Sequence, residues 1–259
     1  FQGLIDSAPD ISDVNIMPMG YATFLYDSDG NEIQKLNSSD GNRISVSIDE
    51  IPLHMQHAIV AVEDSRFYEH NGIDPRGIVR AVFVALKSRF ARTEGASTLT
   101  QQLLKNNVFP NWVEESQIDR VKRKFQEQYL AVKLEASLKA KGQNPKDVIL
   151  ENYLNTVNFG AGAYGIQTAS QTYFGKNCTE LTLSEAAVLA AIPQNPTKYN
   201  PIRHPEHNAQ RRKKVLDDML EQDYISKYKY EEAMADDVYA RILQAVSYTH
   251  LRAHETRGN

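Results

Sequence analysis

From residue 51 onward the chain reads as a succession of helices, and this pattern constrains the fold more than any other feature. Several segments open with a residue that can cap a helix, and apolar side chains then recur at helical spacing. The longest segment begins at Ser116, where Asp119 completes a capping-box pattern, and extends to about residue 142. We therefore predict a mainly α-helical domain over residues 51–246. Its helices should begin near residues 52, 98, 116, 145, 182 and 208.

Ahead of the helices, residues 21–36 ("YATFLYDSDGNEIQKL") have the pattern of a β-hairpin. Two short strand-like runs flank Asp29-Gly30, a pair that favours a tight turn. Asp27 and Asp29 also resemble the metal motif of nucleotide-sugar transferases, but Asp and Gly are the residues that a turn requires. We predict a linker over residues 1–15 and a small β-rich lead-in over residues 16–50.

The composition is ordinary for a globular chain and excludes several classes of function. Hydrophobic residues make up 41% of the 259 positions, and the formal net charge of −4 argues against a general nucleic-acid binder, which would be basic. The single cysteine, Cys178, excludes an internal disulfide and a cysteine-rich zinc site. No apolar run approaches the length of about 18 residues that a membrane span requires, so we predict no span within this sequence.

The first candidate for chemistry is Glu63, which follows five apolar residues, Ala58 to Val62, on a predicted helix. Its carboxylate would project from an apolar part of the helix, where water solvates it poorly. Such surroundings raise the pKa of a carboxyl group and allow it to act as a base near neutral pH. The alternative is that Glu63 and Asp64 form the polar end of a core helix.

The second candidate is the segment "GASTLTQQLLKN" at residues 95–106. Gly95, followed by a cap at Ser97 or Thr98, would direct backbone N–H groups toward a helix N-terminus, which is a natural anion site. The segment is equally compatible with an ordinary capped helix, and it lacks the Gly-x4-Gly-Lys spacing of a P-loop. The polar residues projecting from its first turns would be Gln101, Gln102 and Lys105.

The third candidate is a charged face on the long helix that begins at Ser116. At about 100° per residue, the charged side chains lie within roughly one third of the circumference, opposite a set of apolar ones. Three cations and one acid at this end of a helix suit a diphosphate better than open solvent. The alternative is an Arg123–Glu127 surface pair, which would contribute only a few tenths of a kcal/mol. The charged residues are Arg120, Arg123, Lys124 and Glu127, and the opposite ones are Ile118, Val121, Phe125 and Tyr129.

Three further patterns match known motifs without the structural context that those motifs need. Residues 160–165 ("GAGAYG") match G-x-G-x-x-G but follow a predicted helix, whereas a dinucleotide site follows a strand. Ser226-x-x-Lys229 matches the acylating motif of transpeptidases, but the chain has no Lys-Thr-Gly partner. His250 and His254 lack a third ligand, and they lie in residues 247–259, which have no apolar face and look non-native.

Five blocks in order resemble the peptidoglycan glycosyltransferase family, which comprises the transglycosylase domain of class A penicillin-binding proteins and monofunctional relatives. The resemblance covers about residues 20–245. Two departures are Ala96, where the family usually has a second glycine, and a long stretch over residues 107–122. The blocks are "EDSRFYEHNG" (63–72), "GASTLTQQLLKN" (95–106), "RKFQE" (123–127), "KDVILENYLNTVNFG" (146–160) and "RRKKVL" (211–216).

The resemblance implies a mainly α, lysozyme-like glycosyltransferase domain with a small N-terminal β element. It also implies a membrane-touching segment at residues 77–90, where apolar side chains could enter the lipid interface between basic ones. The alternative is a core helix with basic flanks. The apolar residues are Val82, Phe83, Leu86 and Phe90, and the basic ones are Arg80, Lys87 and Arg89.

The implied reaction is inverting glycosyl transfer, which polymerises lipid II into β-1,4 glycan strands and releases the lipid pyrophosphate. Glu63 would be the catalytic base for the 4-hydroxyl group of the acceptor sugar. Stabilising the departing group is usually the largest catalytic contribution. The implied pyrophosphate ligands are Lys105, Arg123 and Lys124, with Glu127 assisting. Substrate orientation and support would come from Gln101, Gln102, Asp64, Ser97 and Asn155.

The resemblance implies no obligatory cofactor, although Glu127 is compatible with a divalent cation such as Mg²⁺ or Mn²⁺. The expected partners are lipid II, the growing lipid-linked glycan strand and the membrane surface, without nucleic acid. A transpeptidase domain outside this chain is a further expected partner. The expected location is the extracytoplasmic face of the bacterial plasma membrane, with no anchor in this sequence.

Two other functions are compatible with the residues. A lytic enzyme on a lysozyme-like fold would use Glu63 as a general acid, but such hydrolases pair carboxylates across the sugar bond, and the basic residues have no role there. A non-catalytic lipid- or glycan-binding scaffold would not require both Glu63 and Glu127. Growth or shortening of glycan chains distinguishes the transferase from the lytic enzyme.

Overall fold

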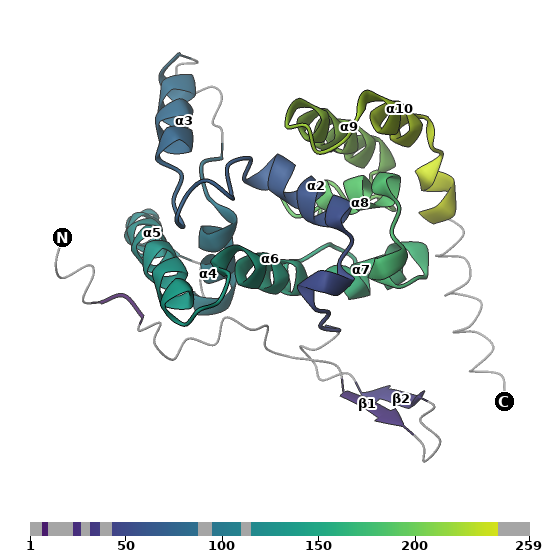
Figure 1. Cartoon of the computed structure of the whole chain (residues 1–259), viewed down its shortest axis with the longest axis horizontal. Coiled ribbons are helices and arrows are strands. Elements are labelled where there is room, and N and C mark those ends of the chain that lie inside the picture. The colour runs from purple at the N-terminus through teal and green to yellow at the C-terminus, as the bar shows by residue number, and fades with distance from the viewer. Residues whose placement is uncertain are drawn as a thin grey trace. The chain divides into compact units, whose positions relative to one another are not determined.

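The computed structural model describes residues 7–9, 23–26, 32–36, 43–87, 95–109 and 115–242. Within these residues the chain is mainly helical, as Figure 1 shows, and the predicted fold class is confirmed at this level. None of the described helices is long and apolar enough to cross a membrane. The elements in chain order are β1 (Thr23–Tyr26), β2 (Glu32–Leu36), η1 (Ile48–Glu50), α2 (Leu53–Glu63), α3 (Pro75–Lys87), α4 (Leu99–Val108), α5 (Gln117–Ala140), α6 (Pro145–Thr156), α7 (Ile166–Phe174), η2 (Cys178–Glu180), α8 (Leu183–Ala190), α9 (Pro205–Glu221) and α10 (Lys227–Ala235).

The chain forms two compact units. Unit 1 comprises residues 1–17 and 63–153, and unit 2 comprises residues 18–62 and 154–259. The segment predicted as one domain, residues 51–246, therefore contributes to both units. The predicted tail, residues 247–259, and the turn at Asp29-Gly30 lie outside the described residues.

The core of unit 1 forms where α4 packs against α5. Both helices begin as the sequence predicts, because Thr98 accepts a hydrogen bond from the backbone of Gln101 and Ser116 accepts one from Asp119. Of the two candidate caps ahead of α4, Thr98 is thus the cap, and Ser97 is left for another contact. The apolar side chains buried between these helices and their neighbours include Phe67, Leu99, Leu103, Leu104, Leu130, Ala131, Leu134, Leu138 and Ile149.

Gly72 fixes the close approach of the loop after α2 to α5. Its φ is +91°, and a Cβ at this position would lie 2.6 Å from the backbone carbonyl carbon and oxygen of Ala131. The carbonyl oxygen of Gly72 also accepts a hydrogen bond from Oγ1 of Thr98 at 2.7 Å. Only glycine satisfies both the positive φ and the missing space, which explains its place at the end of the first sequence block.

The N-terminal half of α5 reverses the usual polarity of a surface helix. Arg123 and Glu127 are buried, with exposed fractions of 6% and 0%. The apolar residues on the other side are exposed instead, and they are Ile118 (69%), Val121 (57%), Phe125 (46%) and Tyr129 (39%). Arg123 and Glu127 therefore lie on the side directed into unit 1, opposite the apolar set, as the helical period predicts. The placement of Arg120 on that charged face is wrong, because this residue is exposed and lines the outer side of α5 with Val121 and Phe125.

Helix α3 also exposes its apolar side chains within unit 1. Val79, Val82, Phe83 and Leu86 have exposed fractions of 69%, 52%, 64% and 61%. The alternative of a buried core helix for this segment is therefore wrong. Helix α3 begins after Asp74, whose carboxylate pairs with Arg66 at 2.5 Å. The predicted residues Arg89 and Phe90 lie outside the described residues.

Unit 2 contains an antiparallel pair, β1 and β2, in which Thr23 lies opposite Leu36, and a helical core centred on α8. Helix α8 packs on α9 and α10, and Thr182 and Glu185 form the predicted capping box at its start. Helix α9 begins at Pro205, three residues earlier than predicted, because proline is favoured at the first helical position. Cys178 is buried and free, as expected for a small apolar side chain.

The structure explains two of the motif matches that lack their usual context. Residues 160–165 follow α6, and their three glycines have φ between +74° and +83°, so they form a turn that leads into α7. Ser226 is the cap of α10 and accepts a hydrogen bond from the backbone of Lys229. Neither α7 nor α10 is predicted from the sequence, because each has only nine residues, too few for a helical period to be distinctive.

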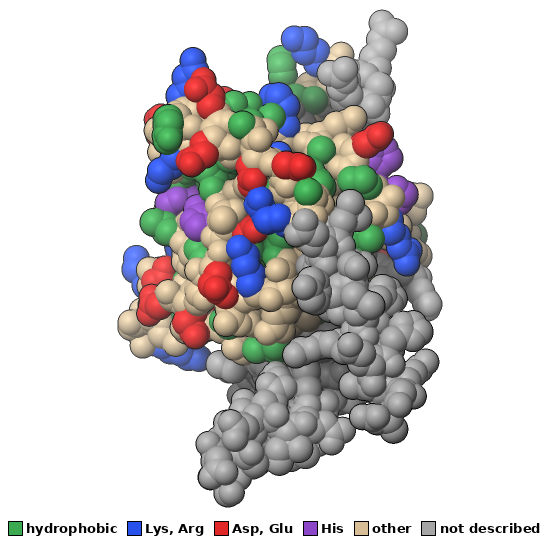
Figure 2. Space-filling view, turned by 90° about the vertical axis from the view of Figure 1, so that its right-hand side faces the viewer, with side chains coloured by type: hydrophobic (Ala, Val, Ile, Leu, Met, Phe, Trp, Pro, Cys, Tyr) green, Lys and Arg blue, Asp and Glu red, His purple; other side chains and the backbone are tan. Residues whose placement is uncertain are grey.

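Charged side chains of both signs are interspersed on the face that Figure 2 presents. This mixture agrees with the formal net charge of −4.

Candidate functional site

Glu63 lies at the C-terminal end of α2 and belongs to unit 1, together with α4 and most of α6. Its carboxylate Oε2 accepts a hydrogen bond from Nε2 of Gln102 at 3.2 Å. The other end of that amide, Oε1 of Gln102, accepts a hydrogen bond from the hydroxyl group of Tyr153 at 3.2 Å. A chain of two hydrogen bonds therefore leads from a buried tyrosine to the candidate base.

Tyr153 determines which way the side-chain amide of Gln102 is oriented. Burial raises the pKa of Tyr153 well above its ordinary value, and the charges of Glu63 and Asp64 raise it further. The hydroxyl group therefore keeps its proton and donates a hydrogen bond to the amide oxygen of Gln102. The amide nitrogen is consequently the atom that faces Glu63. Sequence reasoning missed Tyr153, although it stands within the fourth block.

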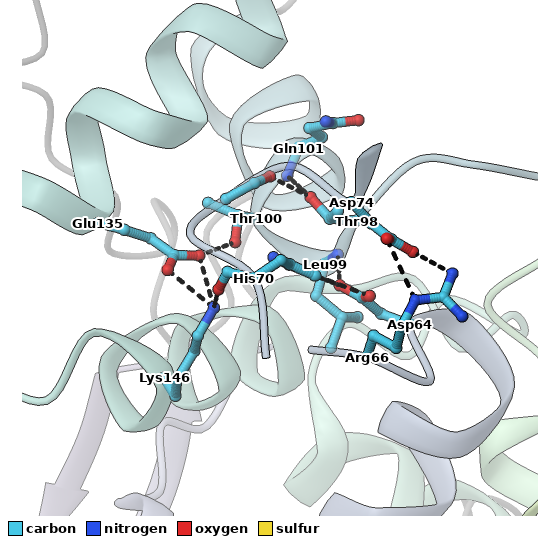
Figure 3. Close-up of polar contacts among 11 residues, drawn as sticks. Asp64, Arg66, His70, Asp74, Thr98, Leu99, Thr100, Gln101, Glu135 and Lys146 are labelled. Carbon is cyan, nitrogen blue, oxygen red and sulfur yellow. Dashed lines mark hydrogen bonds and ion pairs between the residues drawn. The ribbon is translucent and has the colours of Figure 1, made fainter. Parts of the chain in front are cut away.

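Asp64 holds the loop after α2 against the start of α4 (Figure 3). Its Oδ2 accepts a hydrogen bond from the backbone N–H of Leu99 at 2.9 Å, and its Oδ1 lies 2.9 Å from Nε2 of His70. Asp64 and His70 are both buried. A buried carboxylate at a helix N-terminus satisfies N–H groups that the helix itself leaves unpaired. The predicted supporting role of Asp64 thus has a geometric basis in its contact with α4.

A buried ion pair beside this loop joins three further segments (Figure 3). Nζ of Lys146, on α6, lies 2.8 Å from Oε2 of Glu135, on α5. Lys146 also donates to the carbonyl oxygen of His70 at 2.6 Å, and Thr100 on α4 donates to Oε1 of Glu135 at 2.8 Å. Because both charges are paired and hydrogen-bonded, their burial is tolerated.

The buried face of α5 forms a cluster of charges of both signs with Lys105 of α4 and with Glu115, which precedes α5. We call it the anion cluster, and its members are Lys105, Glu115, Arg123, Lys124 and Glu127. Arg123 contacts both acids, since its Nε donates to Glu115 at 2.7 Å and its Nη1 donates to Oε1 of Glu127. The hydrogen bond to Glu115 raises the pKa of Arg123 above its ordinary value. Nζ of Lys124 donates to Oε2 of Glu127 and to Oγ of Ser97, both at 2.9 Å. Ser97 is thus brought to the cluster as predicted, whereas Glu115 was missed.

Lys105 connects the anion cluster to the candidate base electrostatically. Burial lowers the pKa of Lys105 below its ordinary value, and the nearby charge of Lys124 lowers it further. The carboxylates of Glu127 and Glu63 act in the opposite direction on the same group. A single ammonium group therefore lies within the field of Glu63 and of the charged residues on α5.

The residues around Glu127 do not fit a divalent cation in this arrangement. Both of its oxygens face positively charged groups, Oε1 the guanidinium of Arg123 and Oε2 the ammonium of Lys124. Divalent cations bind several oxygen ligands without such competition. Across the part of the chain that the structure describes, no group of three or more His, Cys, Asp or Glu could hold a metal.

Two predicted site residues lie elsewhere. Gln101 is buried, its side chain points away from Asp64 in Figure 3, and its Nε2 has no hydrogen-bond partner among the described residues. Asn155 belongs to unit 2, where its side-chain amide pairs with the backbone N–H and carbonyl of Val46 at 3.0 and 2.8 Å. The other predicted site residues belong to unit 1, where hydrogen bonds, ion pairs or electrostatic interactions link them to neighbouring residues of the site. They are Glu63, Asp64, Ser97, Gln102, Lys105, Arg123, Lys124 and Glu127.

Comparisons with known proteins agree on a single family. A family model described as transglycosylase matches residues 29–220. Penicillin-binding protein 1A of Aquifex aeolicus is 44% identical over 82% of this chain and 27% of its own length. The corresponding values are 39%, 90% and 26% for penicillin-binding protein 1A of Escherichia coli. For penicillin-binding protein 1A/1B of Bacillus subtilis they are 40%, 90% and 24%.

The chain spans about a quarter of the length of these relatives. A crystal structure of penicillin-binding protein 1A from Haemophilus influenzae is 24% identical, covers 86% of this chain and 21% of that one, and has a TM-score of 0.46. The family assignment does not depend on this structure. Because the family model covers most of the sequence, and relatives about 40% identical align with nearly all of it, the chain belongs to the transglycosylase family of class A penicillin-binding proteins.

Proposed function

We propose that this chain is a peptidoglycan glycosyltransferase that polymerises lipid II into β-1,4 glycan strands with inversion at the anomeric carbon. The observation that carries the proposal is that one unit holds both a carboxylate fixed by an amide, Glu63 beside Gln102, and two cations on the buried side of α5, Arg123 and Lys124. A base and a cationic site for a leaving pyrophosphate are the two elements that this transfer needs. Both belong to unit 1.

In the proposed step, Glu63 removes the proton from the 4-hydroxyl group of the acceptor sugar. The resulting oxygen nucleophile forms a bond to the anomeric carbon of the donor as the bond to the lipid pyrophosphate breaks. Lys105, Arg123 and Lys124 stabilise the negative charge that develops on the departing pyrophosphate. Glu127 holds two of these cations in place, as its contacts at the buried face of α5 indicate.

We assign Gln102 and Tyr153 to the orientation of the base. Nε2 of Gln102 donates to Glu63, and Tyr153 fixes the amide so that this nitrogen faces the carboxylate. This hydrogen bond to Oε2 would hold the carboxylate in a fixed orientation while it accepts the substrate proton. Asp64 and Ser97 are supporting residues, and we retain Gln101 and Asn155 as candidate substrate contacts.

The wider setting of the enzyme is part of the same proposal. The exposed apolar side chains of α3 would contact the lipid interface, with lipid II and the growing strand as partners. The domain would have a lysozyme-like fold and work at the extracytoplasmic face of the bacterial plasma membrane, next to a transpeptidase domain. No step is assigned to a metal, because the oxygens of Glu127 are bound by cations.

A lytic enzyme is a weaker candidate on the same geometry. A hydrolase needs a second carboxylate that acts across the sugar bond. Glu127 is fully buried and paired with Arg123 and Lys124, so it is unsuited to that role.

The experiment that tests the function is incubation of the chain with lipid II in detergent, followed by gel separation of the glycan products. We expect a ladder of products that lengthens with time and the release of one lipid pyrophosphate per bond formed. Pre-formed glycan strands should not be shortened. Absence of polymer from a folded preparation, or shortening of added strands, would overturn the proposal.

Replacing Lys105 or Arg123 by Ala is expected to weaken the binding of a pyrophosphate-bearing substrate at least about tenfold, because a charge-assisted contact of about 1.5–3 kcal/mol is lost. Binding of a pyrophosphate-free glycan should change little. Lys122→Ala is the matched control, since this lysine lies on the same helix but is exposed and lies 3.7 Å from Asp119. Calorimetric titration with both ligands gives the comparison, and equal losses for both would assign these residues to structure alone.

The affinity for pyrophosphate should also fall with rising pH earlier than an ordinary lysine would allow. Only protonated Lys105 attracts the anion, and its lowered pKa means that it loses its proton below the usual lysine range. In Lys105→Arg the affinity for pyrophosphate should stay constant to higher pH, because a guanidinium group remains charged over this range. Titration of the ligand across the alkaline range checks this, and identical pH profiles for both proteins would contradict it.

A further inference from the structure

The outer side of α5 carries a groove of about 210 Å³ that the proposed reaction leaves without a role. Its described lining is Arg120, Val121, Lys124, Phe125 and Gln128, and its exposed surface is almost wholly apolar. Its apolar residues, Val121 and Phe125, are both about half exposed. Two of the lining residues, Arg120 and Lys124, are basic.

Lys124 belongs to both the groove and the anion cluster. Its ammonium group donates to Ser97 and Glu127 on the buried side of α5, and the residue also lines the groove. Long basic side chains often lay an apolar stem along an apolar surface while the charged end reaches a polar partner. The groove and the cations that would hold a pyrophosphate therefore adjoin at Lys124.

We propose that this groove binds the first part of the lipid chain of a lipid pyrophosphate, and this proposal rests on the proposed function. In such a ligand an apolar chain follows directly after the diphosphate. The protein has a matching arrangement, because the apolar groove lies next to the cations of the anion cluster. A chain lying over Val121 and Phe125 would remove apolar surface from water that the folded helix otherwise leaves exposed.

Two other occupants would use the surface differently. A bilayer surface would cover the whole exposed apolar side of α5, including Ile118, which does not line the groove. A second protein copy would have no need of an adjacent cation site. Ile118 is therefore a suitable comparison, because it is apolar, exposed and on the same helix.

The test uses two soluble ligands, inorganic pyrophosphate and farnesyl pyrophosphate, which share the diphosphate and differ by the chain. Calorimetric titration gives the dissociation constant of each for the intact protein, for Val121→Ser/Phe125→Ser and for Ile118→Ser. We expect the intact protein to bind farnesyl pyrophosphate at least about tenfold more tightly, because burying apolar chain adds to the affinity. The double variant should lose that difference and keep its affinity for inorganic pyrophosphate, and Ile118→Ser should keep both.

The possible outcomes separate this inference from the proposed function. Equal affinity of the intact protein for the two ligands, or a chain-dependent gain that survives in the double variant, would overturn the groove and leave the anion cluster intact. A gain that Ile118→Ser removes as fully as the double variant would assign the whole apolar side to a membrane or detergent surface. Failure of both ligands to bind would overturn the pyrophosphate site and the groove with it. All substituted side chains are exposed, so the variants should fold normally.

Discussion

Replacing Glu63 by Gln is expected to lower the polymerisation rate by at least about 10²-fold while the fold persists. The amide has the shape of the carboxylate but cannot remove a proton from the acceptor sugar. The side chain is only partly buried, so the change disturbs little packing. Steady-state polymerisation of lipid II, with a thermal unfolding curve beside it, measures both parts of the expectation.

Glu69→Gln is the control for this substitution. Glu69 is exposed on the same loop and lies 3.6 Å from Arg76, so its removal should leave the rate unchanged. A folded Glu63→Gln variant with nearly normal turnover would remove Glu63 from the mechanism. Loss of activity in both variants would point to a general disturbance of the loop instead.

Replacing Gly72 by Ala is expected to reduce the free energy of unfolding by roughly 2–5 kcal/mol. About 1–2 kcal/mol comes from a Cβ at a left-handed backbone position, and about 1–3 kcal/mol from forcing atoms apart in a packed region. The new Cβ would lie 2.6 Å from the backbone of Ala131, and backbone in the middle of α5 cannot move aside as a flexible side chain could. Denaturant unfolding of the two proteins gives the difference.

Gly142 offers a control that separates these two contributions. Its φ is +75°, but a Cβ there would meet nothing within 4 Å. Gly142→Ala should therefore show the backbone cost of about 1–2 kcal/mol without the clash. If the two variants were equally destabilised, the clash between the loop and α5 would contribute nothing to the loss of unfolding free energy in Gly72→Ala.

Local chemistry is the part of this fold that the sequence predicts well. The start of α8 depends on the capping box of Thr182 and Glu185, and the start of α5 depends on the hydroxyl group of Ser116, which accepts from the backbone of Asp119. These residues are visible in the sequence. The position of Glu63 at the end of an apolar helix is equally local. Both features are determined within one or two helical turns, so no knowledge of distant segments is needed.

The contacts between distant segments of the site could not be predicted in this way. The helical period assigns Arg123 and Val121 to different faces of α5, but it does not say which face is buried. Gln101 and Gln102 are adjacent, and only the contacts of Gln102 with Glu63 and Tyr153 identify it as the amide beside the base. Glu115 lies in a stretch where the sequence departs from its family pattern, so nothing local indicated its pairing with Arg123.

The pairing of Arg123 with Glu115 and Glu127 has a consequence for the effect of salt. A bare basic patch gathers dissolved anions, and a ligand that displaces them binds less tightly as the ionic strength rises. Here the protein supplies its own counter-charges, and a pyrophosphate would exchange with the carboxylate of Glu115 rather than with ions from solution. Affinity at this site should consequently vary little between dilute and physiological salt, and the strength of the Glu115 contact, rather than the buffer, would set how readily the ligand enters.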